Sequence, residues 1–111
     1  MPRTKTDTQD FRHFILDQLK DLAELYCRAM FGGHGLYQGE IFFGVIHQGK
    51  LYFKTNALTQ GSYQAYNMTP FSPNAKQTLK HYYQVPIDIL ENSDLLCIWA
   101  KQAISVAQEN V

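Results

Sequence analysis

The chain has 111 residues, of which 45% are apolar and 14% aromatic, so it can build one hydrophobic core and does not have the composition of a disordered protein. Ten basic and ten acidic residues cancel to a formal net charge of zero, which disfavours direct DNA binding by this chain alone. No apolar segment approaches the length of a membrane-spanning helix. We therefore expect one soluble domain over residues 1–111 with no membrane association.

The N-terminal segment and the cysteines bear on the compartment. Residues 1–7 are polar, are expected to be flexible and contain no apolar signal segment, which predicts a cytoplasmic protein. Cys27 and Cys97 are distant in sequence and neither has metal-ligand spacing, so we interpret them as two thiols of the core, with a disulfide left open. The sequence predicts no metal and no cofactor.

A helix is the first predicted element. Apolar residues recur at helical spacing after Asp7, where a polar side chain can cap a helix, and they predict a helix over residues 8–24. The apolar residues of this pattern are Phe11, Phe14, Ile15, Leu19, Leu22 and Leu25.

A glycine-rich segment follows within residues 26–37. Gly32, Gly33 and Gly35 have strand-like residues on both sides, and glycine in a strand marks a bulge, a bend or a close backbone approach. We interpret residues 26–37 as one strand that is broken at Gly32 and Gly33. A phosphate-binding loop is the weaker alternative, because such loops place glycines between a strand and a helix.

Two further strands complete a predicted meander. The pairs Gln38-Gly39 and Gln48-Gly49 are typical of tight hairpin turns, and they bound strands over residues 40–47 and 51–55. The middle strand is apolar on both faces, as expected of a central strand that is covered on each side. The pattern predicts an antiparallel sheet.

The second half of the chain alternates short elements. Asn56 can cap a short helix that ends near Asn67, and two prolines confine residues 70–73 to an edge strand. A strand over residues 77–85, a helical turn from Pro86 and a final helix capped by Asn92 or Ser93 follow. The whole predicts a two-layer α+β fold with the order α-β-β-β-α-β-β-α, in which a mostly antiparallel five-stranded sheet has its helices on one face.

No group of residues has the spacing of a known catalytic motif. The four histidines are far apart in sequence, and no nucleophile has a base at a diagnostic spacing. We therefore expect no enzyme activity. The alternative is a small-molecule-binding or enzymatic protein with a pocket near the glycine segment, where Arg28, His34 and Lys54 would converge.

Tyrosines are unusually frequent, and some share strand faces with lysines. Tyr52 and Lys54 lie on one face of a predicted strand, as do Lys80 and Tyr82, and together they form a candidate interaction face. Tyrosines at the rim of a core are the alternative interpretation. Stacking on single-stranded nucleic acid is less favoured because the net charge is zero.

The run Arg28-Ala29-Met30-Phe31-Gly32-Gly33-His34-Gly35-Leu36-Tyr37 resembles the TfoX (Sxy) N-terminal domain family. The resemblance extends from about residue 11 to residue 107 through residues 42–46, 51–54 and 70–71, Tyr82 and residues 99–100. The candidate signature residues, of unknown role, are Arg28, Met30, Phe31, Gly32, Gly33, Gly35, Leu36 and Tyr37.

The resemblance implies a small α+β domain of bacterial regulators of natural competence. Its longer members are similar to transcriptional co-activators that act with the cyclic-AMP receptor protein and carry a helical C-terminal domain, which we do not expect in this chain. We expect a regulatory domain that acts on a protein partner, with the transcription machinery as the candidate. Competence regulation and a different regulatory role both stay open, as does homodimerisation through an exposed strand or sheet face.

Overall fold

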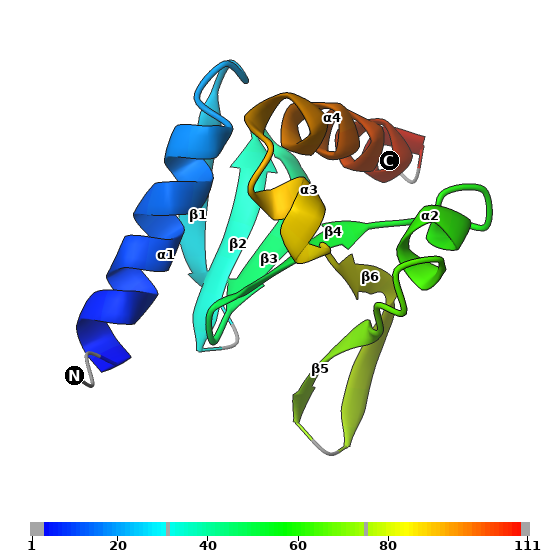
Figure 1. Ribbon diagram of the computed structural model, residues 1–111, viewed down its shortest axis with the longest axis horizontal. Helices are drawn as coiled ribbons and strands as arrows, with labels where there is room; N and C mark the ends of the chain where they lie inside the picture. Colours follow the sequence, from blue (N-terminus) through cyan, green and yellow to red (C-terminus); the bar gives the residue numbers. More distant parts are fainter. Residues whose placement is uncertain (1–3, 31, 75, 110–111) are drawn as a thin grey trace.

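Helices cover one face of an antiparallel sheet with strand order β1-β2-β3-β4-β6-β5 (Figure 1). The computed structural model describes residues 4–30, 32–74 and 76–109. Within these residues the elements are α1 (Thr4–Gln18), β1 (Leu25–Met30), β2 (Gly33–Gln38), β3 (Ile41–His47), β4 (Lys50–Lys54), α2 (Gln60–Gln64), β5 (Pro70–Asn74), β6 (Gln77–Gln84), α3 (Ile87–Leu90) and α4 (Ser93–Glu109). The predicted α+β class is confirmed, with six strands in place of five.

Helix α1 begins and ends earlier than the apolar spacing predicts. Residues 4–7 belong to the helix, ahead of its predicted start at residue 8, and residues 1–3 lie outside the described residues. After α1 the chain continues in turns, in which the amide of Leu22 donates to the carbonyl of Leu19 at 2.9 Å. Leu19 and Leu22 are buried in these turns. Burial continues beyond the helix, and apolar spacing therefore could not show where the helix ends.

The glycine segment forms a hairpin turn, so the predicted single broken strand is wrong. Strands β1 and β2 pair antiparallel from Leu25 opposite Gln38 to Met30 opposite Gly33. Gly32 has a φ of 78°, in the left-handed region that glycine adopts at little cost. Alternation with a period of two continues on both sides of such a turn, which explains why one strand and a hairpin look alike in sequence. This hairpin supplies the sixth strand.

Most of the other predicted turns and caps are confirmed. The exceptions are Asp7, which lies within α1, and Asn56, which accepts from two amides in the turn before α2, where Thr59 occupies the N-cap position. Gly39, Gln48 and Gly49 all have positive φ angles and connect β2 to β3 and β3 to β4. Asn67 has a φ of 62° after α2, as expected for a residue that ends a helix in the left-handed conformation. At α4 the Oδ1 atom of Asn92 accepts from the amide of Leu95 at 3.1 Å, which identifies Asn92 as the cap.

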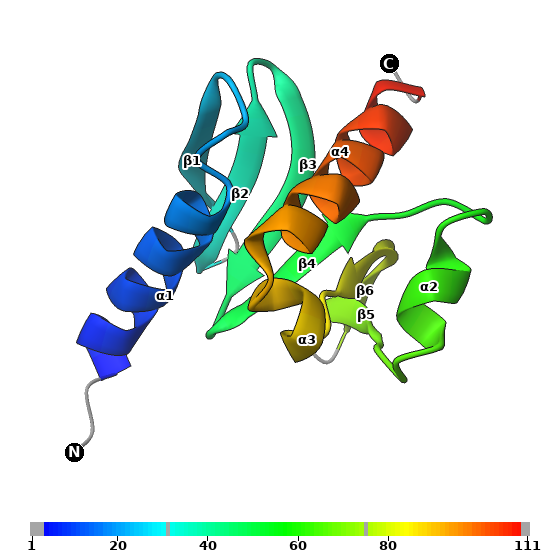
Figure 2. The same ribbon diagram turned by 45° about the horizontal axis from the view of Figure 1, so that its top comes forward.

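The main core lies between the sheet and the helices. Figures 1 and 2 show α1 and α4 on the same side of the sheet, and all four helices contribute buried residues to this core. Its largest contributors are Ile15, Leu19, Leu36, Phe43, Ile46, Leu51, Phe53, Tyr63, Tyr83, Ile89, Leu90, Leu96 and Ile104. The predicted placement of the helices on one face is confirmed.

A β-bulge in β3 places apolar residues on both faces of the sheet. Leu36 pairs with Gly44 and Tyr37 with Phe42, so Phe43 is an additional residue on β3. Phe43 belongs to the main core, whereas Val45, two residues later, packs on the opposite face. Without the bulge, residues 43 and 45 would share a face. The predicted central strand with two apolar faces is confirmed, and the bulge is part of its cause.

The face opposite the helices, here called the outer face, has a second buried cluster made only of strand residues. Its members are Val45, Tyr52, Phe71 and Tyr82, with Phe42 and Leu79 packed against them. The hairpin of β5 and β6 extends away from α1 and α4 (Figure 1). Phe71 of this hairpin lies 4.6 Å from Tyr52 between ring centroids, so β5 helps to bury the outer cluster.

None of the helices within the described residues combines the length and apolar character needed to cross a membrane.

Candidate functional site

Four aromatic rings form a continuous row on the outer face. Tyr26 and Tyr37 stack with centroids 5.4 Å apart, and Tyr37 lies 5.2 Å from Phe42. Phe42 in turn stacks on Tyr82 at 5.4 Å. Tyr26, at the edge of the sheet, is 40% exposed, whereas Tyr82, at the other end, is 8% exposed. We call these four residues the aromatic row.

A cation lies against a ring near each end of the aromatic row. The Cζ atom of Arg28 is 5.6 Å from the centroid of Tyr37, and the Nζ atom of Lys54 is 5.1 Å from that of Tyr82. Both distances allow attraction between a cation and the negative face of an aromatic ring. Arg28 is exposed and Lys54 is half-buried, so both groups are available to a ligand.

Strand register places these residues together. Tyr26 lies opposite Tyr37, and Arg28 lies opposite Gly35 on the same face of the sheet. A Cβ atom at Gly35 would lie 3.0 Å from the sulfur of Met30 and from a ring carbon of Phe42. A glycine at this position therefore lets Met30 and Phe42 meet over the backbone of β2.

The predicted interaction face is assembled in part. Tyr52, Lys54 and Tyr82 come together on the outer face, where Tyr52 lies opposite Gln84 and Lys54 opposite Tyr82. Tyr52 is 8% exposed because Phe71 packs on it, and its burial raises the pKa of its phenol. Tyr52 therefore supports the face from within and offers little contact area to a partner.

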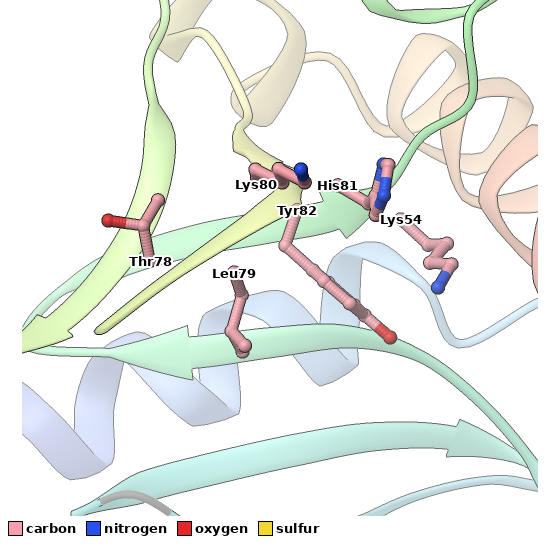
Figure 3. Close-up of a pocket in the computed structure, with 6 residues that line it drawn as sticks. All are labelled: Lys54, Thr78, Leu79, Lys80, His81 and Tyr82. Carbon is pink, nitrogen blue, oxygen red and sulfur yellow. The ribbon is translucent and has the colours of Figure 1, made fainter.

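Lys80 lies beside the same face and lines a surface pocket of about 320 Å³. The pocket is lined by Lys54, Thr78, Leu79, Lys80, His81 and Tyr82 (Figure 3). Figure 3 shows the Leu79 and Tyr82 side chains extending in the same direction, with the Lys54 ammonium group near the Tyr82 ring. Two ammonium groups beside an apolar wall suit a ligand group that is both apolar and negatively charged.

Tyr82 gives the site a measurable pH dependence. Its burial raises the pKa of the phenol to about 12, and the nearby Tyr37 contributes to the rise. A phenol in an unfolded chain ionises near pH ~10, so between that pH and about 12 the unfolded state releases the proton first. The stabilisation is complete below pH ~10 and is lost as the pH rises toward 12.

We expect the urea midpoint of unfolding to fall between pH 9 and pH 11.5, and to fall less steeply in Tyr82→Phe. Phenylalanine removes the ionisable group and keeps the ring that stacks on Phe42. Equal slopes for the two proteins would show that Tyr82 ionises in the folded state as it does in an unfolded chain.

The structure separates the residues of the small-molecule alternative. Arg28 lies on the outer face, whereas His34 faces the helices, where Arg12 donates to its Nε2 atom at 2.6 Å. Burial lowers the pKa of His34, and the Arg12 charge lowers it further. Arg28, His34 and Lys54 therefore do not converge, and the pocket expected at the glycine segment is not formed by them.

The candidate signature residues lie in different parts of the fold. Arg28, Met30 and Tyr37 lie on the outer face, whereas Leu36 is buried in the main core. The glycines shape the backbone: Gly32 at the turn, Gly33 against the Ile46 carbonyl and Gly35 under Met30 and Phe42. Phe31 lies outside the described residues.

The cysteines and acidic residues form no recognisable reactive centre in the described ranges. Cys27 and Cys97 are free thiols, and burial raises the pKa of each. The Sγ atom of Cys97 lies 3.6 Å from the Gln18 carbonyl oxygen, to which it donates. Within residues 4–30, 32–74 and 76–109, no three His, Cys, Asp or Glu side chains are grouped as a metal site would require.

Sequence reasoning missed Tyr26 and Phe42 as members of the site. Both follow from strand pairing: Tyr26 lies opposite Tyr37 only after residues 25–38 are assigned to a hairpin, and Phe42 lies opposite Tyr37 across the bulge. The signal available in the sequence was the Gly32-Gly33 pair between two alternating segments, because glycines at such a point are typical of a tight hairpin turn.

Comparison with known proteins agrees with this assignment of elements. The family model described as the TfoX N-terminal domain matches residues 17–107, a range that begins near the end of α1 and includes every strand. Among curated proteins, none matches the chain. Because the family model covers most of its length, the chain belongs to the TfoX N-terminal domain family.

Proposed function

We propose that this domain is a non-enzymatic regulatory module that binds a protein partner through the aromatic row. The observation that carries the proposal is the outer face, which no helix of the described residues covers and on which four rings lie in contact with a cation near each end. Tyrosine and arginine are enriched among residues that contribute most to protein–protein binding. Their rings remove apolar area from water while the phenol and guanidinium groups still form hydrogen bonds.

The chemistry of the row suggests the chemistry of the partner. Arg28, Lys54 and Lys80 are cationic groups on or beside the outer face, and the Leu79 wall of the adjacent pocket is apolar. A matching surface would present an apolar or aromatic side chain close to carboxylates. The net charge of zero predicts that attraction acts at short range, with little long-range steering of a polyanion.

Membership of the TfoX N-terminal domain family supports a role in competence and transcription regulation. The partner we propose is accordingly a protein of the transcription machinery, bound in the cytoplasm. The pocket beside Lys54 would then receive a side chain of the partner, and the described residues would carry out no chemical step.

The proposal is tested with a partner that is identified by crosslinking and then purified. We expect Arg28→Ala and Tyr37→Ala each to weaken direct binding by about tenfold or more, the loss typical of a central interface residue. Lys101→Ala and Tyr66→Ala are the matched controls, because both lie on the helical side of the domain and are exposed. Isothermal titration calorimetry or surface plasmon resonance gives the affinity of each variant for the partner.

Equal losses in the control variants would contradict the proposal, since the effect would then not belong to the outer face. The proposal would also be contradicted if the purified domain retained no protein partner at all. Thermal unfolding of each variant shows whether a loss of binding reflects a loss of folded protein.

A further inference from the structure

The two edges of the sheet differ in how they are protected. Edge strand β5 contains Pro70 and Pro73 and has two register shifts against β6. Proline and irregular pairing both block the addition of another strand. Edge strand β1 contains no proline, pairs with β2 without a register shift and includes one charged residue, Arg28. Strand β1 is therefore the edge that is open to a further strand.

The hydrogen-bond phase of β1 identifies the backbone groups that are available. The amide of Gly39 donates to the carbonyl of Glu24 at 3.0 Å, so this pair is hydrogen-bonded across the hairpin. In an antiparallel ladder such pairs alternate, so Tyr26 and Arg28 direct their backbone groups toward β2. Leu25, Cys27 and Ala29 then direct theirs to the free edge.

We propose that two copies of this chain pair antiparallel through β1, about a two-fold axis at Cys27. In this register Cys27 faces Cys27 of the partner subunit, and Leu25 faces the partner subunit's Ala29. The two-fold axis repeats the second pair, so three pairs have backbone groups that point outward. Together they provide about six hydrogen bonds between the subunits. An axis at Tyr26 or Arg28 would keep the hydrogen-bond phase but engage two outward pairs within β1 in place of three, and a shift of the pairing register by one residue would set outward-directed groups opposite inward-directed ones and lose most of these bonds.

The side chains of β1 are complementary to a second copy in the same register. Tyr26 lies opposite Arg28 of the partner subunit, and the two-fold axis repeats this pair. These are non-hydrogen-bonded positions, where opposing side chains approach most closely, so a guanidinium can lie over a phenol ring. Residues 26 and 28 are exposed in the single chain and face the same side as the aromatic row. On the other side only Leu25, Cys27 and Ala29 meet, so no like charges oppose one another.

Pairing through β1 would join two aromatic rows into one surface. Arg28 already lies over Tyr37 of its own chain, and Tyr26 stacks on the same ring. In the paired state these groups continue into those of the second copy, giving one sheet of twelve strands, six from each chain. This inference stands without the proposed function, because it rests on backbone phase and self-complementary side chains.

Sedimentation velocity over a range of protein concentrations tests the association. We expect dimers that dissociate on dilution, and we expect Ala29→Pro to weaken association by about tenfold or more because proline removes an outward amide. Ala29→Ser, which keeps the amide, is the matched control and should associate as the original chain does. A monomer at every concentration, or equal association of the proline and serine variants, would overturn the inference.

A thiol experiment tests the register even if the proline variant does not fold. Tyr26→Cys and Arg28→Cys are prepared separately in chains that also carry Cys27→Ser and Cys97→Ser, and are then mixed and oxidised. Opposing non-hydrogen-bonded positions lie within disulfide range, whereas diagonal positions do not. We expect the mixture to form the hetero-disulfide at least about fivefold faster than either variant forms a homo-disulfide. Equal rates, or no disulfide, would exclude the proposed register, and capture of another protein in place of a second copy would exclude the dimer.

Discussion

Gly33→Ala is expected to lower the free energy of unfolding by about 3 kcal/mol, the upper part of the usual range for overpacking. A Cβ atom at this position would overlap the carbonyl oxygen of Ile46 and press on Cα of His47. Both are backbone atoms of β3, so no flexible side chain can move aside. The hairpin of β1 and β2 would have to separate from β3, and this movement would disturb Leu36 in the core. Urea unfolding followed by circular dichroism measures the loss.

Gly61→Ala is the control for this prediction. Gly61 lies in α2, and beyond its chain neighbours and the backbone of its own helix no described atom lies within 4 Å of the position of an added Cβ. Alanine favours a helix more than glycine does, so we expect unchanged stability or a gain of about 0.5 kcal/mol. If Gly33→Ala were as stable as Gly61→Ala, the close approach of β2 and β3 at Gly33 would be wrong.

Phe53→Ala is expected to cost about 4 kcal/mol, because truncating a fully buried phenylalanine leaves a cavity. The ring of Phe53 is 0% exposed and lies 5.8 Å from Phe43 between centroids, within the core that the helices cover. Denaturant titration gives the change in the midpoint, and an unchanged slope shows that unfolding keeps its cooperativity.

The neighbouring residue gives a matched control for this prediction too. Lys54→Ala changes a half-buried side chain on the outer face, and we expect it to cost less than about 1 kcal/mol while it weakens partner binding. A loss of stability in Lys54→Ala equal to that in Phe53→Ala would contradict the separation of the two faces.

These two predictions assign different roles to the two faces of the sheet. Residues that face the helices stabilise the fold, and exposed residues of the outer face can change with little loss of stability. The division is incomplete at Tyr52 and Tyr82, which are nearly buried on the outer face and support the exposed end of the row. Substitutions at Tyr26 or Arg28 therefore test binding more cleanly than substitutions at Tyr52.

Local sequence patterns were reliable where a single residue type determines the conformation. Asn67, Gly39 and Gly49 adopt the positive φ angles expected of them, and Pro70 lies on an edge strand. Strand parity grouped Lys54 with Tyr52 and Lys80 with Tyr82, and the structure places the Nζ atom of Lys54 5.1 Å from the centroid of the Tyr82 ring. Patterns with a fixed period thus predicted which residues share a face along one strand.

What the sequence determined by itself was the α+β class, the positions of most turns and caps, and the presence of an apolar central strand. Only the tertiary structure decided that residues 25–38 form a hairpin, that Phe43 and Val45 point to opposite faces and that α1 ends at Gln18. Alternation along the chain is the same for one strand or two, and a bulge changes it by one residue with no local mark. The aromatic row depends on pairing between strands, and that pairing is set by contacts between residues far apart in sequence.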